Sequence, residues 1–214
     1  MGERLKLTEI FHSLQGEADS VGMPTVFVRL TGCPLRCGYC DTAYAFYGGQ
    51  WWELPAILEA VARHSTRYVC VTGGEPLAQR SCLTLLSALT DAGYRVSLET
   101  SGAMPIAQVD ARVIRVVDIK TPGSGEEPRN RYEQLALLRA EEQVKFVICD
   151  RSDYEWSRAL LARTGLAQRC QVLFSPSHAQ LPAHALADWI LEDKLPVRFQ
   201  IQLHKYLWGN VPGK

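Results

Sequence analysis

Residues 25–42 read Thr-Val-Phe-Val-Arg-Leu-Thr-Gly-Cys-Pro-Leu-Arg-Cys-Gly-Tyr-Cys-Asp-Thr, an apolar run rich in β-branched residues that leads directly into a loop with three thiols. The run predicts a buried β-strand. Cys33, Cys37 and Cys40 lie close enough in sequence to wrap around one metal centre. Three thiolates fit a 4Fe-4S cluster with one iron open to a non-protein ligand, whereas closed structural zinc sites normally take four protein ligands.

A zinc site is the alternative explanation for the three thiols. It would need a fourth ligand, for which His12 and Asp41 are the nearest candidates, and it would make the chain a zinc-stabilised binding module. The other four of the seven cysteines are scattered, and an odd total does not suit a disulfide framework. We expect these four to be small core hydrophobes: Cys70, Cys82, Cys149 and Cys170.

Length and composition narrow the class of protein. The chain has 214 residues, 47% of them hydrophobic, and its 23 Lys and Arg balance 23 Asp and Glu. These values predict one domain, residues 1–214, around one large core. Zero net charge argues against direct binding of nucleic acid or of a membrane surface. The sequence has no long apolar run and no signal-like N-terminus, so we expect a soluble, cytoplasmic protein without a membrane span.

Short β-branched runs alternate with stretches of helical periodicity along most of the chain, which predicts parallel βα units. The expected strands are residues 25–30, 68–72, 95–99, 113–119, 144–148, 171–174 and 199–202, with an edge strand or hairpin over residues 5–10. The expected helices are residues 54–63, 81–92, 131–139, 153–164 and 183–192. Gly93 suits a left-handed cap after the second helix, and Ser152 suits the N-cap of the fourth.

The fold class expected from this pattern is α/β, as a partial or full (β/α) barrel. No Gly-x-Gly-x-x-Gly follows the first strand, which argues against a dinucleotide-binding sheet. In such barrels the chemistry gathers at the C-terminal ends of the strands. Residues 121–128, Thr-Pro-Gly-Ser-Gly-Glu-Glu-Pro, are expected to form a mobile loop at the edge of the sheet.

Two motifs resemble those of radical S-adenosylmethionine (SAM) enzymes. One is the Cys-x3-Cys-x2-Cys spacing with aromatic Tyr39 before the last thiol, and the other is Thr-Gly-Gly-Glu-Pro at residues 72–76. The resemblance implies a partial, radical-SAM-type (β/α) barrel with mostly parallel strands. It also implies a 4Fe-4S cluster on Cys33, Cys37 and Cys40, whose open iron binds SAM and cleaves it to methionine and a 5′-deoxyadenosyl radical. The two glycines would let backbone carbonyls approach the amino group of the methionine.

Longer segments resemble one branch of these enzymes, the 7-carboxy-7-deazaguanine synthases. Residues 9–17, Glu-Ile-Phe-His-Ser-Leu-Gln-Gly-Glu, are similar to the N-terminal segment of that branch, and residues 27–33 and 40–42 are similar to its sequence around the cluster. Residues 99–102 and 118–122 resemble later family segments. Two residues depart from the family pattern, which has glycine and asparagine where this chain has Ala18 and Ser101.

The resemblance implies a carbon–nitrogen lyase of queuosine biosynthesis. Such an enzyme converts 6-carboxy-5,6,7,8-tetrahydropterin into 7-carboxy-7-deazaguanine by radical ring contraction, with hydrogen abstraction from C6 and loss of ammonia. The implied cofactors are a 4Fe-4S cluster, SAM and Mg²⁺, and the implied partners are an electron donor such as flavodoxin or ferredoxin and a second copy of the chain. A glycyl-radical enzyme activase is the rival enzyme, but the Gln-Gly-Glu of residues 15–17 does not support it.

The resemblance also assigns residues to ligands, although it identifies no acid/base pair. Thr42 matches the Mg²⁺ ligand. The residues expected to hold SAM are Tyr39, Asp41, Gly74, Asp118, Lys120 and Ser175. The residues expected to bind the pterin are Leu14, Gln15, Gly16, Arg29, Thr72 and Pro212.

Several of these assignments have plainer alternatives. Arg29 could form a strand-end salt bridge instead of a bidentate contact to the substrate carboxylate, and Gln15 could lie in a solvated turn. Thr42 could cap the turn after the cluster loop, and Lys120 could extend to solvent from the end of its strand. His204 and the tail at residues 208–212 could close the pocket, or could pack in the core or in an interface.

Overall fold

The structure, a computed structural model, describes residues 2–214 and is built on a nine-stranded sheet with the order β3-β1-β2-β4-β5-β6-β7-β8-β9. Strands β1 (Arg4–Leu14) and β3 (Gln50–Glu53) form an antiparallel edge beside β2 (Pro24–Leu30). From β2 onward every neighbouring pair is parallel. The parallel strands after β2 are β4 (Tyr68–Gly73), β5 (Arg95–Thr100), β6 (Ile114–Ile119), β7 (Gln143–Ile148), β8 (Gln171–Pro176) and β9 (Arg198–Phe199).

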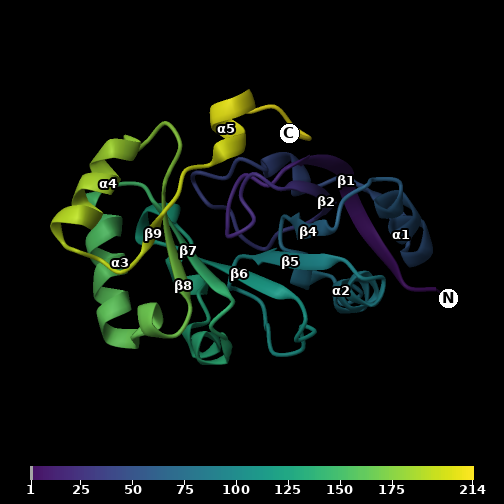
Figure 1. Cartoon of the computed structure of the whole chain (residues 1–214), viewed down its shortest axis with the longest axis horizontal. Helices are drawn as coiled ribbons and strands as arrows, with labels where there is room; N and C mark the ends of the chain where they lie inside the picture. Colours follow the sequence, from purple (N-terminus) through teal and green to yellow (C-terminus); the bar gives the residue numbers. More distant parts are fainter. Residues whose placement is uncertain (1) are drawn as a thin grey trace.

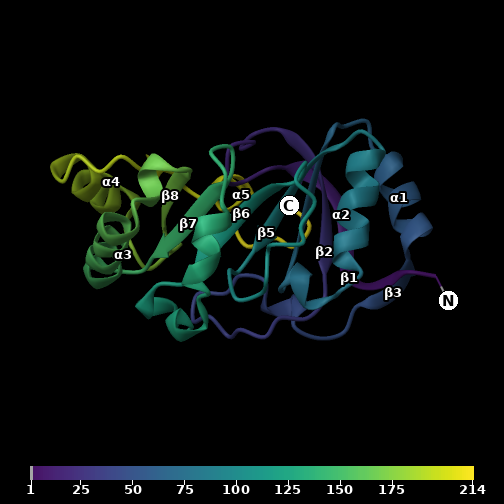
Figure 2. The ribbon, with the colours of Figure 1, turned by 90° about the horizontal axis from the view of Figure 1, so that it is seen from below.

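The sheet is open, because β3 and β9 at its two ends do not pair with each other. A partial barrel and a full barrel were both predicted, and the open sheet with its mostly parallel strands is the partial one. Helices α1 (Leu54–Ala62) and α2 (Cys82–Asp91) lie at one end of the molecule, and α3 (Arg151–Thr164) and α4 (Ala183–Glu192) lie at the other (Figures 1 and 2). Within residues 2–214 no helix combines the length and the apolar character needed to cross a bilayer.

Successive side chains along each strand point alternately toward the helices outside the sheet and toward the interior of the barrel. In β5, Val96 and Leu98 join the core beneath the helices, whereas Glu99 lines a cavity on the inner face. One apolar cluster lies between the first strands and helices α1 and α2, and a second lies between β6–β8 and helices α3 and α4. The inner face is consequently free to carry polar groups.

Two helix caps were predicted, one after α2 and one before α3, and the structure confirms the first. Gly93 follows α2 with φ of 88°, a left-handed conformation that glycine adopts without a steric penalty, as predicted. Ser152 is not the N-cap of α3, because the helix begins one residue before it. The side chain of Asp150 takes that role and accepts a hydrogen bond of 2.9 Å from the Asp153 N–H.

Other local expectations were wrong. The helix expected over residues 131–139 is a shorter 3₁₀ helix, Tyr132–Leu137, in which the Gln134 side chain bonds to backbone atoms of the β5–β6 connection. The last strand is reduced to Arg198–Phe199, and a helix, α5 (Leu203–Trp208), follows it. Strand β3 was not anticipated, because its sequence is too short for a clear period of two.

Candidate active site

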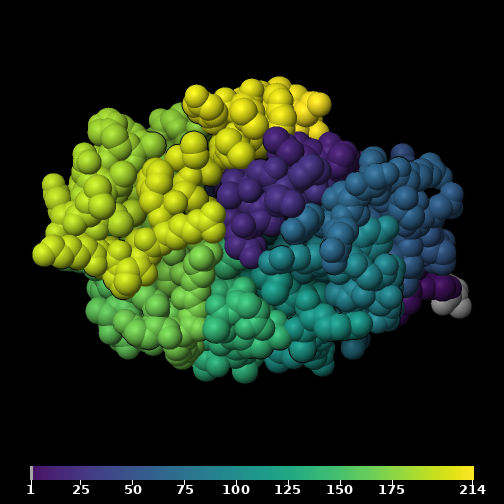
Figure 3. Space-filling view, in the orientation of Figure 1, coloured from purple at the N-terminus to yellow at the C-terminus, as the bar shows by residue number. Residues whose placement is uncertain are grey.

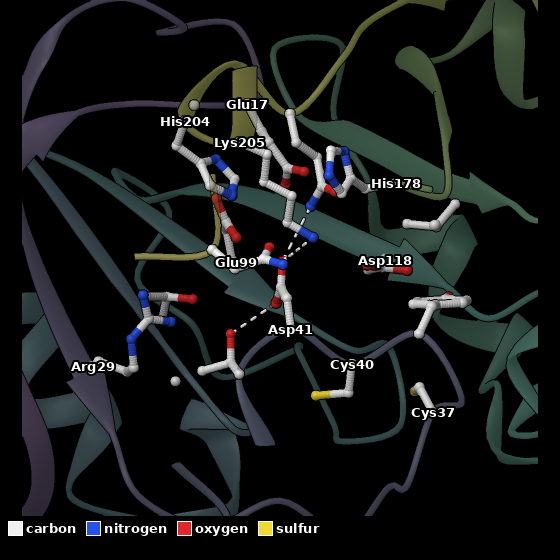
Figure 4. A pocket seen from close by; sticks show the side chains of 18 of the residues that line it. Glu17, Arg29, Cys37, Cys40, Asp41, Glu99, Asp118, His178, His204 and Lys205 are labelled. Carbon is white, nitrogen blue, oxygen red and sulfur yellow. Dashed lines mark hydrogen bonds and ion pairs between the residues drawn. The ribbon is translucent and has the colours of Figure 1, made fainter. Parts of the chain in front are cut away.

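A cavity of about 710 Å³ opens at the C-terminal ends of the parallel strands, where the fold class predicts chemistry. Segments far apart in the sequence line it, namely the end of β1, the three-thiol loop, the ends of β4–β7 and the C-terminal tail (Figure 4). Of the residues predicted for the site, the cavity is lined by Leu14, Gln15, Gly16, Arg29, Cys33, Cys37, Tyr39, Cys40, Asp41, Thr42, Thr72, Gly74, Asp118, Lys120 and Pro212.

Ser175 is the predicted residue that does not line the cavity. It pairs with Val147, whose side chain does line the cavity, so both residues belong to the inner face. The Ser175 side chain is covered, with 1% exposure, and its hydroxyl has no hydrogen-bond partner. Contact between Ser175 and SAM stays a prediction, and it would require a movement of the residues that cover the hydroxyl.

The three-thiol loop forms a compact turn on the cavity wall. The Cys40 N–H donates to the Cys37 carbonyl at 3.1 Å, and the Leu35 N–H donates to the Cys33 sulfur at 3.4 Å. Burial raises the pKa of Cys37 to about 11, although the nearby Lys120 ammonium opposes that effect. Half-buried thiols beside an amide donor and an ammonium group fit iron ligation, in which all three become thiolates.

The fourth zinc ligand suggested as an alternative does not join the thiols. His12 stacks on His64 with ring centroids 5.2 Å apart, and it is not among the residues of the cavity wall. Asp41 does lie at the cavity, but its carboxylate pairs with Lys205 at 2.9 Å. In the part of the chain that the structure describes, no three His, Cys, Asp or Glu side chains converge on a single metal ion.

The Gly-Gly-Glu-Pro segment packs directly against the start of the three-thiol loop. The Gly74 N–H donates to the Leu30 carbonyl at 3.1 Å, and the Glu75 N–H donates to the Gly32 carbonyl at 2.8 Å. A Cβ added at Gly74 would lie 2.2 Å from the Gly32 carbonyl oxygen and 2.8 Å from the Cys33 Cβ. Glycine is therefore required there for the contact between the end of β4 and the loop, besides any approach to a ligand.

Glu75 joins the ends of two neighbouring strands. Its carboxylate is fully buried and accepts hydrogen bonds from the Thr100 hydroxyl, from the Ser101 N–H at 2.7 Å and from the Leu77 N–H at 3.0 Å. The Ser101 hydroxyl donates to it as well, at 2.5 Å. Serine at this departure from the family pattern thus keeps a hydrogen-bond donor where asparagine would offer an amide.

The connection after β6, expected to be a mobile loop, is held in place from two sides. It forms two 3₁₀ turns, Pro122–Ser124 and Glu127–Arg129. Asp153, which is 1% exposed, accepts hydrogen bonds from the Thr121 hydroxyl at 2.9 Å and the Gly123 N–H at 2.8 Å. The Ser124 carbonyl in turn accepts from the Gly38 N–H at 3.0 Å, so this connection supports the three-thiol loop.

Replacing Asp153 with alanine is expected to lower both stability and iron content. The change leaves buried donors without an acceptor, and each such group costs about 1–3 kcal/mol. Asp153→Asn, which keeps one acceptor oxygen, should have an intermediate effect. Urea unfolding and iron analysis after anaerobic reconstitution measure both quantities, with Asp188→Ala on the exposed side of α4 as the control. Wild-type stability in Asp153→Ala would contradict this role.

Lys145 and Glu17, which were not among the predicted site residues, join the predicted Asp118 and Lys120 in a charged group that lines the cavity. Lys145 pairs with Glu17 at 2.5 Å and with Asp118 at 3.5 Å, and Lys120 pairs with Asp118 at 3.1 Å. Burial opposes a charge on Lys145, but the carboxylates outweigh it and raise its pKa well above the usual value. The sequence did contain a signal for Lys145, because it lies within the apolar run of β7. A lysine in the middle of a buried strand cannot extend to solvent and therefore needs a partner inside the protein.

Arg29 forms the strand-end ion pair that was its alternative role. Its Nε lies 2.8 Å from Glu9, and its guanidinium lies over the rings of Phe11 and Tyr44, with centroids at 5.4 and 5.8 Å. The ion pair uses Nε alone, so the two terminal nitrogens stay available on the cavity wall. The ion pair and the aromatic rings orient the guanidinium, which is compatible with a bidentate contact to a carboxylate.

Gln15 and Thr42 do not adopt their plainer alternatives. Gln15 is 3% exposed, its oxygen accepts from the Gly16 N–H at 2.9 Å, and its amide nitrogen has no partner among the described residues. Thr42 occupies the N-cap position of a short 3₁₀ helix but makes no capping bond. Its hydroxyl donates to Asp41 at 2.8 Å instead, which leaves its oxygen lone pairs free to accept or coordinate.

Comparison with known proteins agrees with this geometry. Residues 27–116 match the radical SAM superfamily. The chain is 42% identical over 208 residues to the 7-carboxy-7-deazaguanine synthase of Chlorobaculum tepidum, across 96% of this chain and 94% of that protein. This chain belongs to the 7-carboxy-7-deazaguanine synthase family. It is thus a radical SAM enzyme by descent, and the family predicted from residues 9–17 and the three thiols is confirmed.

Other members of the synthase family match over similar lengths. The synthases of Koribacter versatilis and Thermoplasma acidophilum are 41% and 35% identical to this chain, and the alignments cover 97% and 99% of those proteins. The crystal structure of QueE from Escherichia coli covers 94% of this chain with a TM-score of 0.73 at 22% identity. Streptococcus suis SuiB bound to S-adenosylmethionine covers 80% with a TM-score of 0.58 at 15% identity. These structural likenesses confirm the predicted radical-SAM-type fold.

Proposed function

We propose that this chain converts 6-carboxy-5,6,7,8-tetrahydropterin into 7-carboxy-7-deazaguanine with loss of ammonia. The observation that carries the proposal is that one cavity is lined both by the three thiols and by polar groups that have free bonding capacity: the Arg29 terminal nitrogens, the Gln15 amide and the Tyr39 hydroxyl. Family membership supports the product, which the names of the related synthases state.

The residues present fit the cofactors that the family implies. Cys33, Cys37 and Cys40 would hold a 4Fe-4S cluster, and Tyr39, Asp41, Gly74, Asp118 and Lys120 line the space beside it for SAM. When bound, these cofactors supply the radical that abstracts hydrogen from C6 of the pterin. Lys120, whose pKa is raised because Asp118 outweighs the effect of burial, keeps its positive charge on that wall.

The chain itself binds and orients the substrate. Arg29 would pair with the substrate carboxylate through its terminal nitrogens, and Gln15 with the backbone of Leu14 and Gly16 would read the donor and acceptor edge of the pterin. Thr72 and Pro212 line the same cavity from β4 and from the C-terminal tail. Enclosure by these segments excludes water and fixes the reacting carbon, which is the contribution that positioning makes to the rate.

Thr42 would supply the protein oxygen to Mg²⁺. Its hydroxyl hydrogen is engaged by Asp41, so its lone pairs stay free to coordinate, and Mg²⁺ takes its other ligands from water and from substrate oxygens. The proposal further includes reduction by a flavodoxin or ferredoxin, a homodimer and a cytoplasmic setting, in which free thiols persist.

Anaerobic reconstitution followed by incubation with SAM, Mg²⁺, dithionite and carboxytetrahydropterin tests this function. We expect iron and sulfide in near-equal amounts, broad visible absorption, and 7-carboxy-7-deazaguanine in the reaction mixture. Stoichiometric zinc without iron would instead support the binding module. A loaded cluster that cleaves SAM but forms no deazaguanine would favour an activase that acts on a protein.

A further inference from the structure

The C-terminal strap, residues 201–214, lies across the cavity without the support of buried apolar side chains. Helix α5 within it contains no buried residue, and Tyr206, Leu207 and Val211 are 78%, 45% and 52% exposed. Figure 3 shows this last segment of the chain on the surface, against the N-terminal segment. Apart from the partly buried Leu203 and Trp208, the strap is therefore held by polar contacts with the segments around the cavity.

Those contacts converge on one carboxylate in the three-thiol loop. Lys205 Nζ lies 2.9 Å from Asp41 Oδ2, and the Gln202 amide donates to the same oxygen at 3.2 Å (Figure 4). The Lys205 side chain is 8% exposed and that of Asp41 is 37% exposed, so water is excluded from the lysine side of this ion pair but reaches the carboxylate. A second anchor is the Leu203 N–H, which donates to the Gly16 carbonyl at 3.0 Å.

The same carboxylate orients Thr42. Asp41 Oδ1 accepts the Thr42 hydroxyl at 2.8 Å, while Oδ2 holds the strap. The strap in turn contributes His204 and Pro212 to the cavity wall. One side chain beside the thiols thus links the closed position of the strap with the direction of the Thr42 hydroxyl.

We propose that Lys205 is a positioning residue, which latches the C-terminal strap onto Asp41 and so closes the cavity over its contents. Opening of the latch would admit the pterin, and closing would bring His204 and Pro212 back to the cavity wall. The identity of the molecules in the cavity rests on the proposed function, whereas the contact between Lys205 and Asp41 does not depend on it.

The Lys205→Met variant tests the latch with two independent readouts. Hydrogen exchange of the Leu203 and Gly209 amides should become at least about tenfold faster, because loss of the ion pair lowers the free energy of local opening. In the assay, kcat/KM for the pterin should fall about 10²-fold, which is the loss of rate expected when a substrate is misplaced. The KM for the pterin should rise more than the KM for SAM. A larger share of SAM cleavage should occur without product.

Two further variants separate the latch from general damage. Lys205→Arg keeps a cation that reaches Asp41, and it should restore exchange and the pterin KM to within about threefold of wild type. Arg63→Met removes an exposed ion pair with Glu59 far from the cavity and should change neither quantity. Iron content should be equal in all three variants.

Wild-type amide exchange in Lys205→Met would overturn the latch. Faster exchange with an unchanged pterin KM would overturn its coupling to the cavity. If the wild-type protein formed no deazaguanine, the proposed function would fail, but the exchange measurement would still decide whether Lys205 holds the strap.

Discussion

Replacing Cys37 with alanine is expected to leave a folded protein with no turnover above background. The cluster needs three thiolates, and the variant keeps only those of Cys33 and Cys40. Because Cys37 is only half buried in a loop, the loss of its thiol should cost little stability. Iron and sulfide analysis with visible absorption measures the cluster, and SAM cleavage measures its consequence.

Cys82→Ala is the matched control for that variant. Cys82 is the first residue of α2, where it is fully buried in the apolar core, and it does not line the cavity. The control should keep the full iron content and the full activity. Retention of a redox-active cluster in Cys37→Ala would contradict the assignment of the three thiols.

Gly74→Ala is expected to disable the enzyme although it adds one methyl group. The new Cβ would lie 2.2 Å from a backbone oxygen of Gly32, which no rotamer change can relieve, so the three-thiol loop must shift. A displacement of this kind at a reacting centre costs about 10²-fold or more in kcat/KM. Titration with SAM and the anaerobic assay measure the loss.

Gly38→Ala makes the same chemical change in the same loop but should be tolerated. A Cβ at Gly38 meets no atom within 4 Å, and its N–H bond to the Ser124 carbonyl is kept. Equal activity of Gly38→Ala and wild type, together with loss in Gly74→Ala, would identify contact with Gly32 as the cause. Equal activity of all three proteins would contradict that contact.

Much of the fold could be predicted because the parallel strands are buried runs of β-branched residues with strong periodicity. The register of β2 with β4 places the thiol loop beside the glycine motif, which explains why motifs about forty residues apart in the chain act together. The elements that sequence reasoning missed, β3 and α5, are short and exposed, and their form depends on tertiary contacts such as those of Lys205 with Asp41.

The site could be predicted where a group of residues of one type points to a single chemical role. Three closely spaced thiols and paired glycines are of that kind, and the structure brings both to one cavity. Lys145 and Glu17 were not found, because a lysine within an apolar run does not reveal which carboxylate it will meet until the strands are paired. The role of Glu75 was hidden for the same reason, since its partners lie on the next strand.

The most direct measurement follows one hydrogen atom. Reconstituted protein would be incubated anaerobically with SAM, Mg²⁺, dithionite and carboxytetrahydropterin deuterated at C6, and the products would be weighed by mass spectrometry. The account predicts 7-carboxy-7-deazaguanine together with 5′-deoxyadenosine that carries deuterium, and neither product from Cys37→Ala. Deuterium-free 5′-deoxyadenosine without any deazaguanine would contradict it.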